Sequence, residues 1–231
     1  MVPPFFACAA VAFEDVEMLR EGVRQCKLYH ALLADVDPTS PTVGLWRHIA
    51  GLAHEDRGYW VTGCGWVAAG LVRVLAVLVH LPASFPFPEE EKEEAKTILL
   101  GYIADLITGA IRTDDGGDGT GLLRNYLTDP TYFPDAAGTA LLASVVVRLA
   151  VLMPDDFDKE GLAVKWAEEK RQAVLGCVDS SSGVVGSACK STDHKSKAPL
   201  AKGEVNPEAQ AFVALLECAW RDWLQWRGRE V

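Results

Sequence analysis

The residues of this chain best suited to chemistry are carboxylates that stand in turn-like segments. Asp114, Asp115 and Asp118 lie among the glycines of segment 114–121. Their spacing matches an aspartate-rich magnesium motif and, in part, the start of a calcium-binding loop, although Asn125 replaces the closing glutamate of that loop. The magnesium motif belongs on a helix, whereas aspartate and glycine favour turns for backbone reasons. We therefore expect a structural turn here.

A second pair of carboxylates, Asp129 and Asp135, borders the proline-flanked segment 130–134. Two carboxylates across a loop can serve a glycosidase as acid and base. Asp135 directly precedes an apolar helical pattern, and an aspartate in that position usually caps the helix. Segment 44–48 ends in His48, whose imidazole is suited to a site near neutral pH. The alternative for His48 is a loop histidine bonded to the backbone.

These candidates lie in or beside three related segments, 37–48, 114–124 and 179–188. Each segment has an acid, then small turn residues, then glycine followed by a short apolar stretch. Each follows an amphipathic helical pattern and precedes a more uniformly apolar one. Recurrence of such a unit predicts a repeat architecture, and the repeating unit is a helical hairpin.

Helical periodicity predicts an all-α fold of about seven helices in a single domain over residues 1–231. One apolar stripe marks outer helices over 16–33, from Pro88 through Leu106, and over 157–177. Residues 5–12, 66–80, 139–153 and 209–226 are apolar on nearly all sides, which is typical of buried helices. The long glycine-rich links all follow outer helices. We expect these long loops to gather at one end and to form a cleft there.

Composition excludes several classes of function. A net charge of -10 argues against binding nucleic acid, because phosphate contacts need clustered Lys and Arg. No run approaches the ~20 apolar residues that a membrane helix needs. The six cysteines form no CxxC or Cys/His cluster, so we expect no metal and no cofactor, although Cys177 and Cys189 flank a loop and are able to pair. The absence of a glycosylation sequon favours a cytoplasmic chain, or a secreted one if a signal lies upstream.

Several segments also occur in the order found in a known family. The chain resembles the unsaturated glucuronyl and rhamnogalacturonyl hydrolases of glycoside hydrolase families 88 and 105, and among them the fungal members. The resemblance implies an (α/α)6 barrel of six-hairpin glycosidase type, of which this chain is a partial barrel from the C-terminal portion. The segments that carry it are Met1-Val-Pro-Pro-Phe5, Gly44-Leu-Trp-Arg-His48, Tyr59-Trp-Val-Thr-Gly-Cys-Gly-Trp66, 121–130 with 138–142, and Pro207-Glu-Ala-Gln-Ala-Phe212.

The resemblance implies action on unsaturated uronyl oligosaccharides of the pectin or rhamnogalacturonan type. An aspartate of the family protonates the enol-ether double bond of the uronic acid, and water then adds. That aspartate falls upstream of Met1, so the catalytic residue is unknown in this chain. We expect the chain alone to be an incomplete or inactive hydrolase. The alternatives are a non-catalytic carbohydrate-binding or interaction protein derived from a truncated glycosidase, and a glycosidase of changed substrate.

The resemblance also implies substrate-binding residues. His48 matches the active-site histidine, and Trp60 and Trp66 match aromatic residues that flank the sugar. Thr62 stands where bacterial members often place an arginine for the substrate carboxylate, so a bidentate clamp is missing at this position. A partial barrel exposes apolar flanks of its inner helices, and we expect self-association through them.

Overall fold

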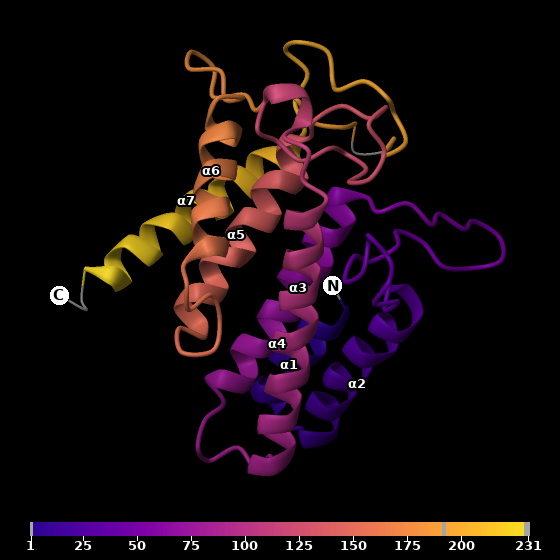
Figure 1. The fold of residues 1–231 in the computed structure, drawn as a ribbon. Helices are drawn as coiled ribbons and strands as arrows, with labels where there is room; N and C mark the ends of the chain where they lie inside the picture. Colours follow the sequence, from indigo (N-terminus) through magenta and orange to yellow (C-terminus); the bar gives the residue numbers. More distant parts are fainter. Residues whose placement is uncertain (1, 191–192, 229–231) are drawn as a thin grey trace.

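The computed structural model describes residues 2–190 and 193–228, and its regular structure is helical throughout that part of the chain (Figure 1). The all-α prediction is confirmed. The elements are α1 (Val2–Phe13), α2 (Val16–Leu33), α3 (Val61–Val79), α4 (Glu89–Arg112), the short 3-10 turn η1 (Gly117–Gly119), α5 (Ala136–Leu152), α6 (Leu162–Leu175) and α7 (Pro207–Arg227).

The helices form two layers, as the sequence predicts. Along the inner layer α1 packs on α3, α3 on α5, and α5 on α7. The outer helices each cover the preceding inner one, because α2 packs on α1, α4 on α3 and α6 on α5. Burial follows this arrangement, since α5 at the centre is buried along almost its whole length. The order of inner and outer helices is therefore that of consecutive helical hairpins.

Two helices, α3 and α6, begin five residues away from the predicted position. Helix α3 starts at Val61 rather than 66, and no side chain caps it. Its first residue is held from outside instead, because the Val61 N–H donates to the carbonyl of Asn125 at 2.9 Å. Helix α6 starts at Leu162 rather than 157, because the Asp158 carboxylate accepts the N–H groups of Ala163 and Val164 at 2.8 Å each and makes residues 158–161 a turn.

The long connections 34–60, 113–135 and 176–206 meet at one end of the helical layers (Figure 1, top). Backbone hydrogen bonds join them. The Leu127 N–H donates to the carbonyl of Tyr59 at 3.0 Å, and the Ala136 N–H donates to the carbonyl of Ser187 at 2.7 Å. The predicted gathering of the three loops is confirmed, and the inner helices α3, α5 and α7 all begin beneath them.

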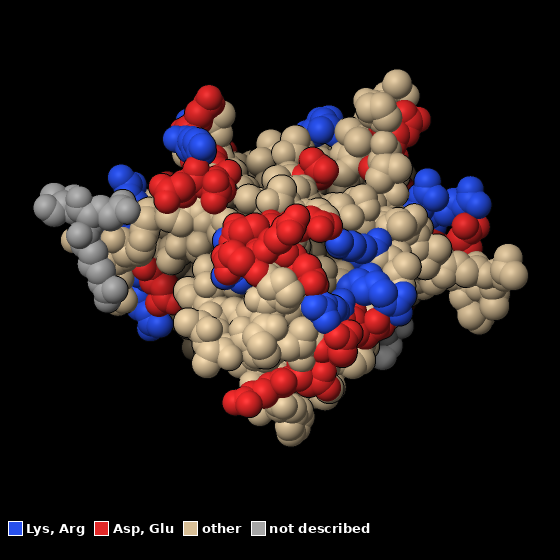
Figure 2. Space-filling view, turned by 90° about the horizontal axis from the view of Figure 1, so that it is seen from below, with Lys and Arg blue, Asp and Glu red and all other residues tan. Residues whose placement is uncertain are grey.

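The opposite end of the molecule carries interleaved charges, with acidic side chains gathered over its middle and basic ones beside them (Figure 2). The acidic start of α4 lies at this end. It pairs with α2, because Arg20 contacts Glu91 at 2.8 Å and Lys27 contacts Glu94 at 3.2 Å. These pairs are largely exposed, so solvent screens them and they stabilise the fold only a little.

The first and last helices of the inner row are less buried than their apolar patterns alone predict. On α1 the side chains of Phe5 and Phe13 are 68% and 75% exposed, and on α7 Leu224 is 53% exposed. The pattern of α1 predicts a helix covered all round, which is wrong for its outward face, whereas the expected partial barrel leaves the flanks of inner helices exposed. The physical reason is its place in the fold, because α1 and α7 each have one inner neighbour, whereas α3 and α5 have two.

Helix α3 is longer than the predicted helix 66–80, because it also includes residues 61–65. Its length and composition would allow it to cross a membrane, yet 61% of its apolar window is buried inside the fold. A central helix of a soluble core has the same properties. The neighbours α1, α4 and α5 pack on α3 and account for the burial of its apolar side chains.

Candidate functional site

His48 lies where the three long loops meet, paired with Asp56. Its Nδ1 is 3.1 Å from Asp56 Oδ2, and the same oxygen accepts the hydroxyl of Tyr126 at 2.6 Å. The other carboxylate oxygen accepts the Gly58 N–H at 3.0 Å. Burial alone would raise the pKa of Asp56, but the hydrogen bonds from Tyr126, His48 and Gly58 hold it at about 2. Asp56 is therefore a carboxylate across the physiological pH range.

The local backbone explains why His48 and Asp56 meet. Residues 48–58 fold back on themselves, with the Ile49 N–H donating to the Asp56 carbonyl at 2.9 Å and the Asp56 N–H returning a bond of 3.0 Å. Glycine is required at position 58, because a Cβ there would lie 2.4 Å from the ring of Tyr126. The tight turn and the missing side chain let Tyr126 reach the carboxylate.

Aromatic rings from two further places complete the cluster. The Trp60 ring lies 4.7 Å from the ring of His48, and the His194 ring lies 4.5 Å from it on another side. The buried amide of Asn125 links these parts, because it accepts the indole N–H of Trp60 at 2.9 Å and donates to the His194 carbonyl at 2.7 Å. We call His48, Asp56, Trp60, Tyr126 and His194 the loop-end cluster.

The four predicted substrate-binding residues do not all lie together. His48 and Trp60 belong to the loop-end cluster. Thr62 is only 1% exposed, and its hydroxyl faces inward and donates to Asp135 Oδ2 at 3.4 Å. Trp66 lies further along α3, with its ring edge-on to Phe212 at 5.1 Å. The structure therefore brings two of the four candidates into one cluster and places the other two elsewhere.

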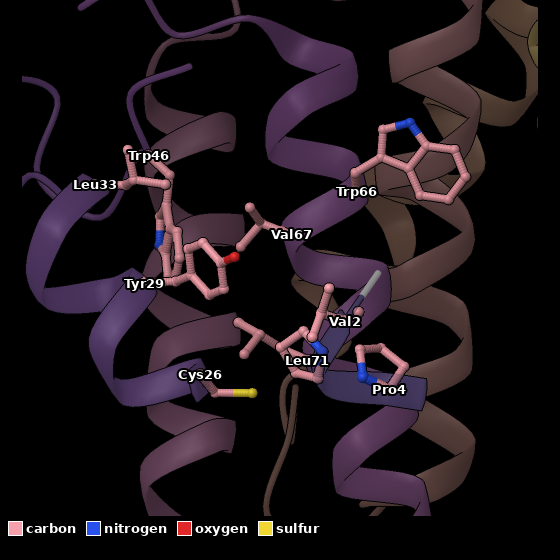
Figure 3. A pocket seen from close by; sticks show the side chains of 11 residues that line it. Val2, Pro4, Cys26, Tyr29, Leu33, Trp46, Trp66, Val67 and Leu71 are labelled. Atoms are coloured by element: carbon pink, nitrogen blue, oxygen red, sulfur yellow. The ribbon is translucent and has the colours of Figure 1, made fainter. Parts of the chain in front are cut away.

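Trp66 lines a separate apolar pocket of about 270 Å³ between α1, α2 and α3. Figure 3 shows Tyr29 and Trp46 on one side of this pocket and Val67 and Leu71 of α3 on the other. The lining contains neither a carboxylate nor a histidine. This pocket offers mainly apolar contact, with the Cys26 thiol and the Tyr29 hydroxyl among its few polar groups.

Asp135 is buried and caps α5, as the sequence analysis expects. One of its oxygens accepts the Gly138 N–H at 2.6 Å and the other accepts the Cys189 N–H at 3.3 Å. Burial raises the pKa of Asp135 to about 6 despite these hydrogen bonds. Asp129 differs from it, because Asp129 lies at the surface and pairs with Lys197 at 3.2 Å. Asp135 thus has a structural partner for each oxygen, which favours the capping role over the acid–base pair.

The aspartates of segment 114–121 are held by basic side chains. Asp115 and Asp118 bind Arg124 at 2.5 and 2.6 Å. Asp114 pairs with the buried Lys170 and accepts the indole N–H of Trp166 at 2.8 Å. The segment folds as the turn η1 with glycines at positive φ. The expectation of a structural turn is confirmed, and the same pairs explain why these carboxylates do not resemble a magnesium or calcium site.

Sequence reasoning missed Asp56, Asn125, Tyr126 and His194. Asp56 has a signal only in its nearness to His48 in the same loop, whereas the others have none, because 70 residues separate Asp56 from Tyr126 and 69 separate Asn125 from His194. The pairing of Cys177 with Cys189 that the sequence allowed is not found, and both thiols are free. Cys177 follows α6 directly, whereas Cys189 is buried beneath the loops.

Comparison with known proteins identifies the fold. No protein-family model and no curated protein sequence matches this chain. Among solved structures, a possible member of family GH105 from Salmonella enterica superposes with a TM-score of 0.73 at 17% identity, covering 94% of this chain and 54% of that one. A glycosyl hydrolase of family 88 from Bacteroides vulgatus gives 0.70 at 14% identity, covering 96% and 61%. A polysaccharide lyase gives 0.71 at 16% identity, covering 97% and 60%.

These likenesses confirm the predicted fold class. The chain has the helical-hairpin fold of the family 88 and 105 six-hairpin glycosidases, and it spans about half to three-fifths of the length of the structures that it matches. At these sequence identities, the likeness shows a shared fold and nothing more. The fungal affinity that the sequence suggests stays a prediction.

Proposed function

We propose that this chain binds unsaturated uronyl oligosaccharides of the pectin or rhamnogalacturonan type at the loop-end cluster. The observation that carries the proposal is the meeting of His48 with Trp60 where three long loops converge above the inner helices. A tryptophan face suits the C–H side of a sugar, while imidazole and carboxylate groups suit its hydroxyls. Such a mixture of one aromatic platform with converging polar groups is typical of small-molecule sites.

The charge near the cluster favours an acidic sugar. Lys195 lies beside the cluster, with its Nζ 3.7 Å from Asp56 Oδ2 and its side chain 58% exposed. Lys197, from the same loop, stacks its ammonium over the ring of Tyr132. Thr62 supplies no positive charge for a uronate carboxylate, and we propose that the lysines of this loop take that part. Lysine binds an anion as a point charge rather than as a bidentate clamp.

We propose further that these residues bind the sugar without catalysing its hydrolysis. The general acid implied by the resemblance has no counterpart among residues 1–231. Two carboxylates near the loop-end cluster are otherwise engaged, since Asp56 is bonded to His48 and Tyr126 and Asp135 caps α5. Loss of the ultraviolet absorbance of an unsaturated uronide in the presence of this chain would contradict this part of the proposal.

Replacing Trp60 should weaken sugar binding. Titration calorimetry with a 4,5-unsaturated digalacturonide should show that Trp60→Ala raises the dissociation constant by about 10-fold, which corresponds to about 1.4 kcal/mol. The reason is the loss of the aromatic face beside His48. Trp223→Ala is the matched control, because this tryptophan lies on α7 and packs on Trp220 at 4.8 Å. Equal affinity of Trp60→Ala and the unchanged chain would refute the placement of the site.

We also propose that a second copy of this chain covers the exposed flanks of α1 and α7. Each copy offers both flanks, and each flank carries exposed apolar side chains, Phe5 and Phe13 on α1 and Leu224 on α7. Light scattering at micromolar concentration should give a mass above the 25.0 kDa of one chain, and Phe5→Glu with Phe13→Glu should lower it. A monomer before any substitution would count against this proposal.

A further inference from the structure

The loop-end cluster has the side chains of a metal site, which goes beyond the proposed sugar binding. We propose that His48, Asp56 and His194 bind one divalent transition-metal ion, with zinc as the representative ion. Each of the three offers one ligand atom, and these atoms lie within 4.8 Å of one another. Two imidazole nitrogens with one carboxylate oxygen form a ligand set that zinc and similar ions accept.

The distances between ligand atoms fit an ion in their midst. Ligands about 2.1 Å from a tetrahedral zinc ion stand roughly 3.4 Å apart. His48 Nδ1 lies 3.1 Å from Asp56 Oδ2, and His194 Nε2 lies 3.9 Å from the same oxygen. These two separations fall on either side of the expected value. The three ligand atoms all lie within 4.8 Å of one another, so they must draw closer together to surround one ion.

One ligand atom has no hydrogen-bond partner. His194 Nε2 is shielded from solvent and is the single buried side-chain polar atom without a partner among residues 2–190 and 193–228. Buried polar atoms are nearly always paired, so an orphan of this kind calls for a specific explanation, such as an ion. A cation between His194 and Asp56 satisfies the nitrogen and the carboxylate together. The orphan atom and the ligand distances are independent observations that point to the same place.

The surroundings hold the ligands in place. Asp56 accepts the Tyr126 hydroxyl at 2.6 Å and the Gly58 N–H at 3.0 Å. The backbone of His194 is fixed by the buried amide of Asn125 at 2.7 Å. Hydrogen bonds to a ligating carboxylate orient it, and partners of this kind are a regular part of metal sites. The three protein ligands leave at least one coordination position for another ligand, as in catalytic zinc sites.

Lys195 is the group that competes with the ion. Its Nζ lies 3.7 Å from Asp56 Oδ2, where a bound dication would repel it. The side chain is 58% exposed, so the ammonium can move into solvent when the ion binds. Because Lys195 competes with the ion, removing its charge should increase the affinity for the metal rather than decrease it. In the absence of an ion the Asp56 carboxylate keeps its hydrogen bonds from Tyr126, His48 and Gly58, and the lysine adds to them.

The test measures zinc binding to the purified chain by titration calorimetry. The buffer does not bind metals, and no sugar is present. The chain should take up one zinc ion at micromolar metal. His194→Gln should weaken binding at least 10-fold, because the loss of even an outer partner of a ligand costs about 10–100-fold. His54→Gln is the matched control, since His54 is exposed and stands in the same loop as Asp56. Lys195→Met should strengthen binding, whereas Lys202→Met, an exposed lysine of the same loop as Lys195, should not.

A cobalt spectrum separates this site from the cysteines. Cobalt bound by two histidines and a carboxylate gives visible bands without the intense near-ultraviolet absorption of thiolate ligands. Absence of zinc binding, equal affinity of His194→Gln and His54→Gln, or a thiolate spectrum would each overturn the metal site. Because no sugar is present, such a failure leaves the proposed sugar binding standing. Failure of sugar binding would likewise leave the metal site standing.

Discussion

Lys170→Met should lower the free energy of unfolding by about 3–5 kcal/mol, the range for breaking one buried ion pair. Lys170 and Asp114 have side chains only 6% and 11% exposed, and their ion pair joins α6 to the loop before α5. The ammonium also donates to the carbonyl of Gly121 at 2.8 Å. Methionine fills the same space but leaves the Asp114 carboxylate buried without its counter-charge. Urea denaturation of both proteins measures the difference.

Two further variants make this prediction specific. Lys165→Met changes an exposed lysine on the same helix and should alter stability by no more than about 0.5 kcal/mol. The double variant Asp114→Asn with Lys170→Met should recover part of the loss, because no buried charge is left unpaired. If Lys170→Met and Lys165→Met are equally stable, the ion pair does not hold the loop to α6.

Asp135 should make the chain less stable as the pH rises from about 4 to about 6. Burial raises its folded-state pKa from 3.8 to about 6, so the folded state binds more protons than the unfolded state in this interval. A raised pKa of an acid stabilises the fold at low pH, and this stabilisation is lost as the pH rises through the folded pKa. The shift corresponds to about 3 kcal/mol. The free energy of unfolding of the unchanged chain should fall by this amount relative to Asp135→Asn, whose side chain does not ionise.

Asp129, the aspartate at the surface, should change the stability with pH in the opposite direction and serves as the comparison. Hydrogen bonds from Thr131, with Lys197 contributing, lower the pKa of Asp129 to about 2. A lowered pKa stabilises the fold above the unfolded-state pKa, and this contribution is lost as the pH falls. Urea denaturation at several pH values should therefore give opposite slopes for Asp135→Asn and Asp129→Asn, each taken against the unchanged chain. Parallel slopes would contradict the burial of an ionisable Asp135.

Much of the fold follows from patterns within single helices. The alternation of striped and uniformly apolar segments predicted the inner and outer layers, and the length of the glycine-rich links predicted the loop end. The beginning of α3 was missed, because its first N–H is held by Asn125 rather than by a local cap. The exposure of α1 followed from the expected partial barrel and not from the helix itself, because an apolar pattern does not reveal how many neighbours a helix has.

The candidate site was predictable only in part. His48 and Trp60 came from a resemblance in short segments, and the structure places them side by side. Asp56 stands in the same loop as His48 and meets it through the local fold of residues 48–58. Tyr126 and His194 join them only through the meeting of three loops, and side chains so far apart in sequence leave no spacing to recognise. Thr62 came from the same segment as Trp60, yet it faces Asp135. Trp60 and Thr62 stand at the start of α3, where two positions along the helix are enough to turn a side chain from the loops toward the core. The local sequence does not show where the helix starts.

The most direct measurement is a crystal structure of this chain with a 4,5-unsaturated digalacturonide. The account predicts sugar density in contact with the Trp60 ring and within hydrogen-bonding distance of His48, with the uronate carboxylate near Lys195. Density confined to the apolar pocket lined by Trp46 and Trp66, or no density at a concentration that saturates the calorimetric signal, would contradict it.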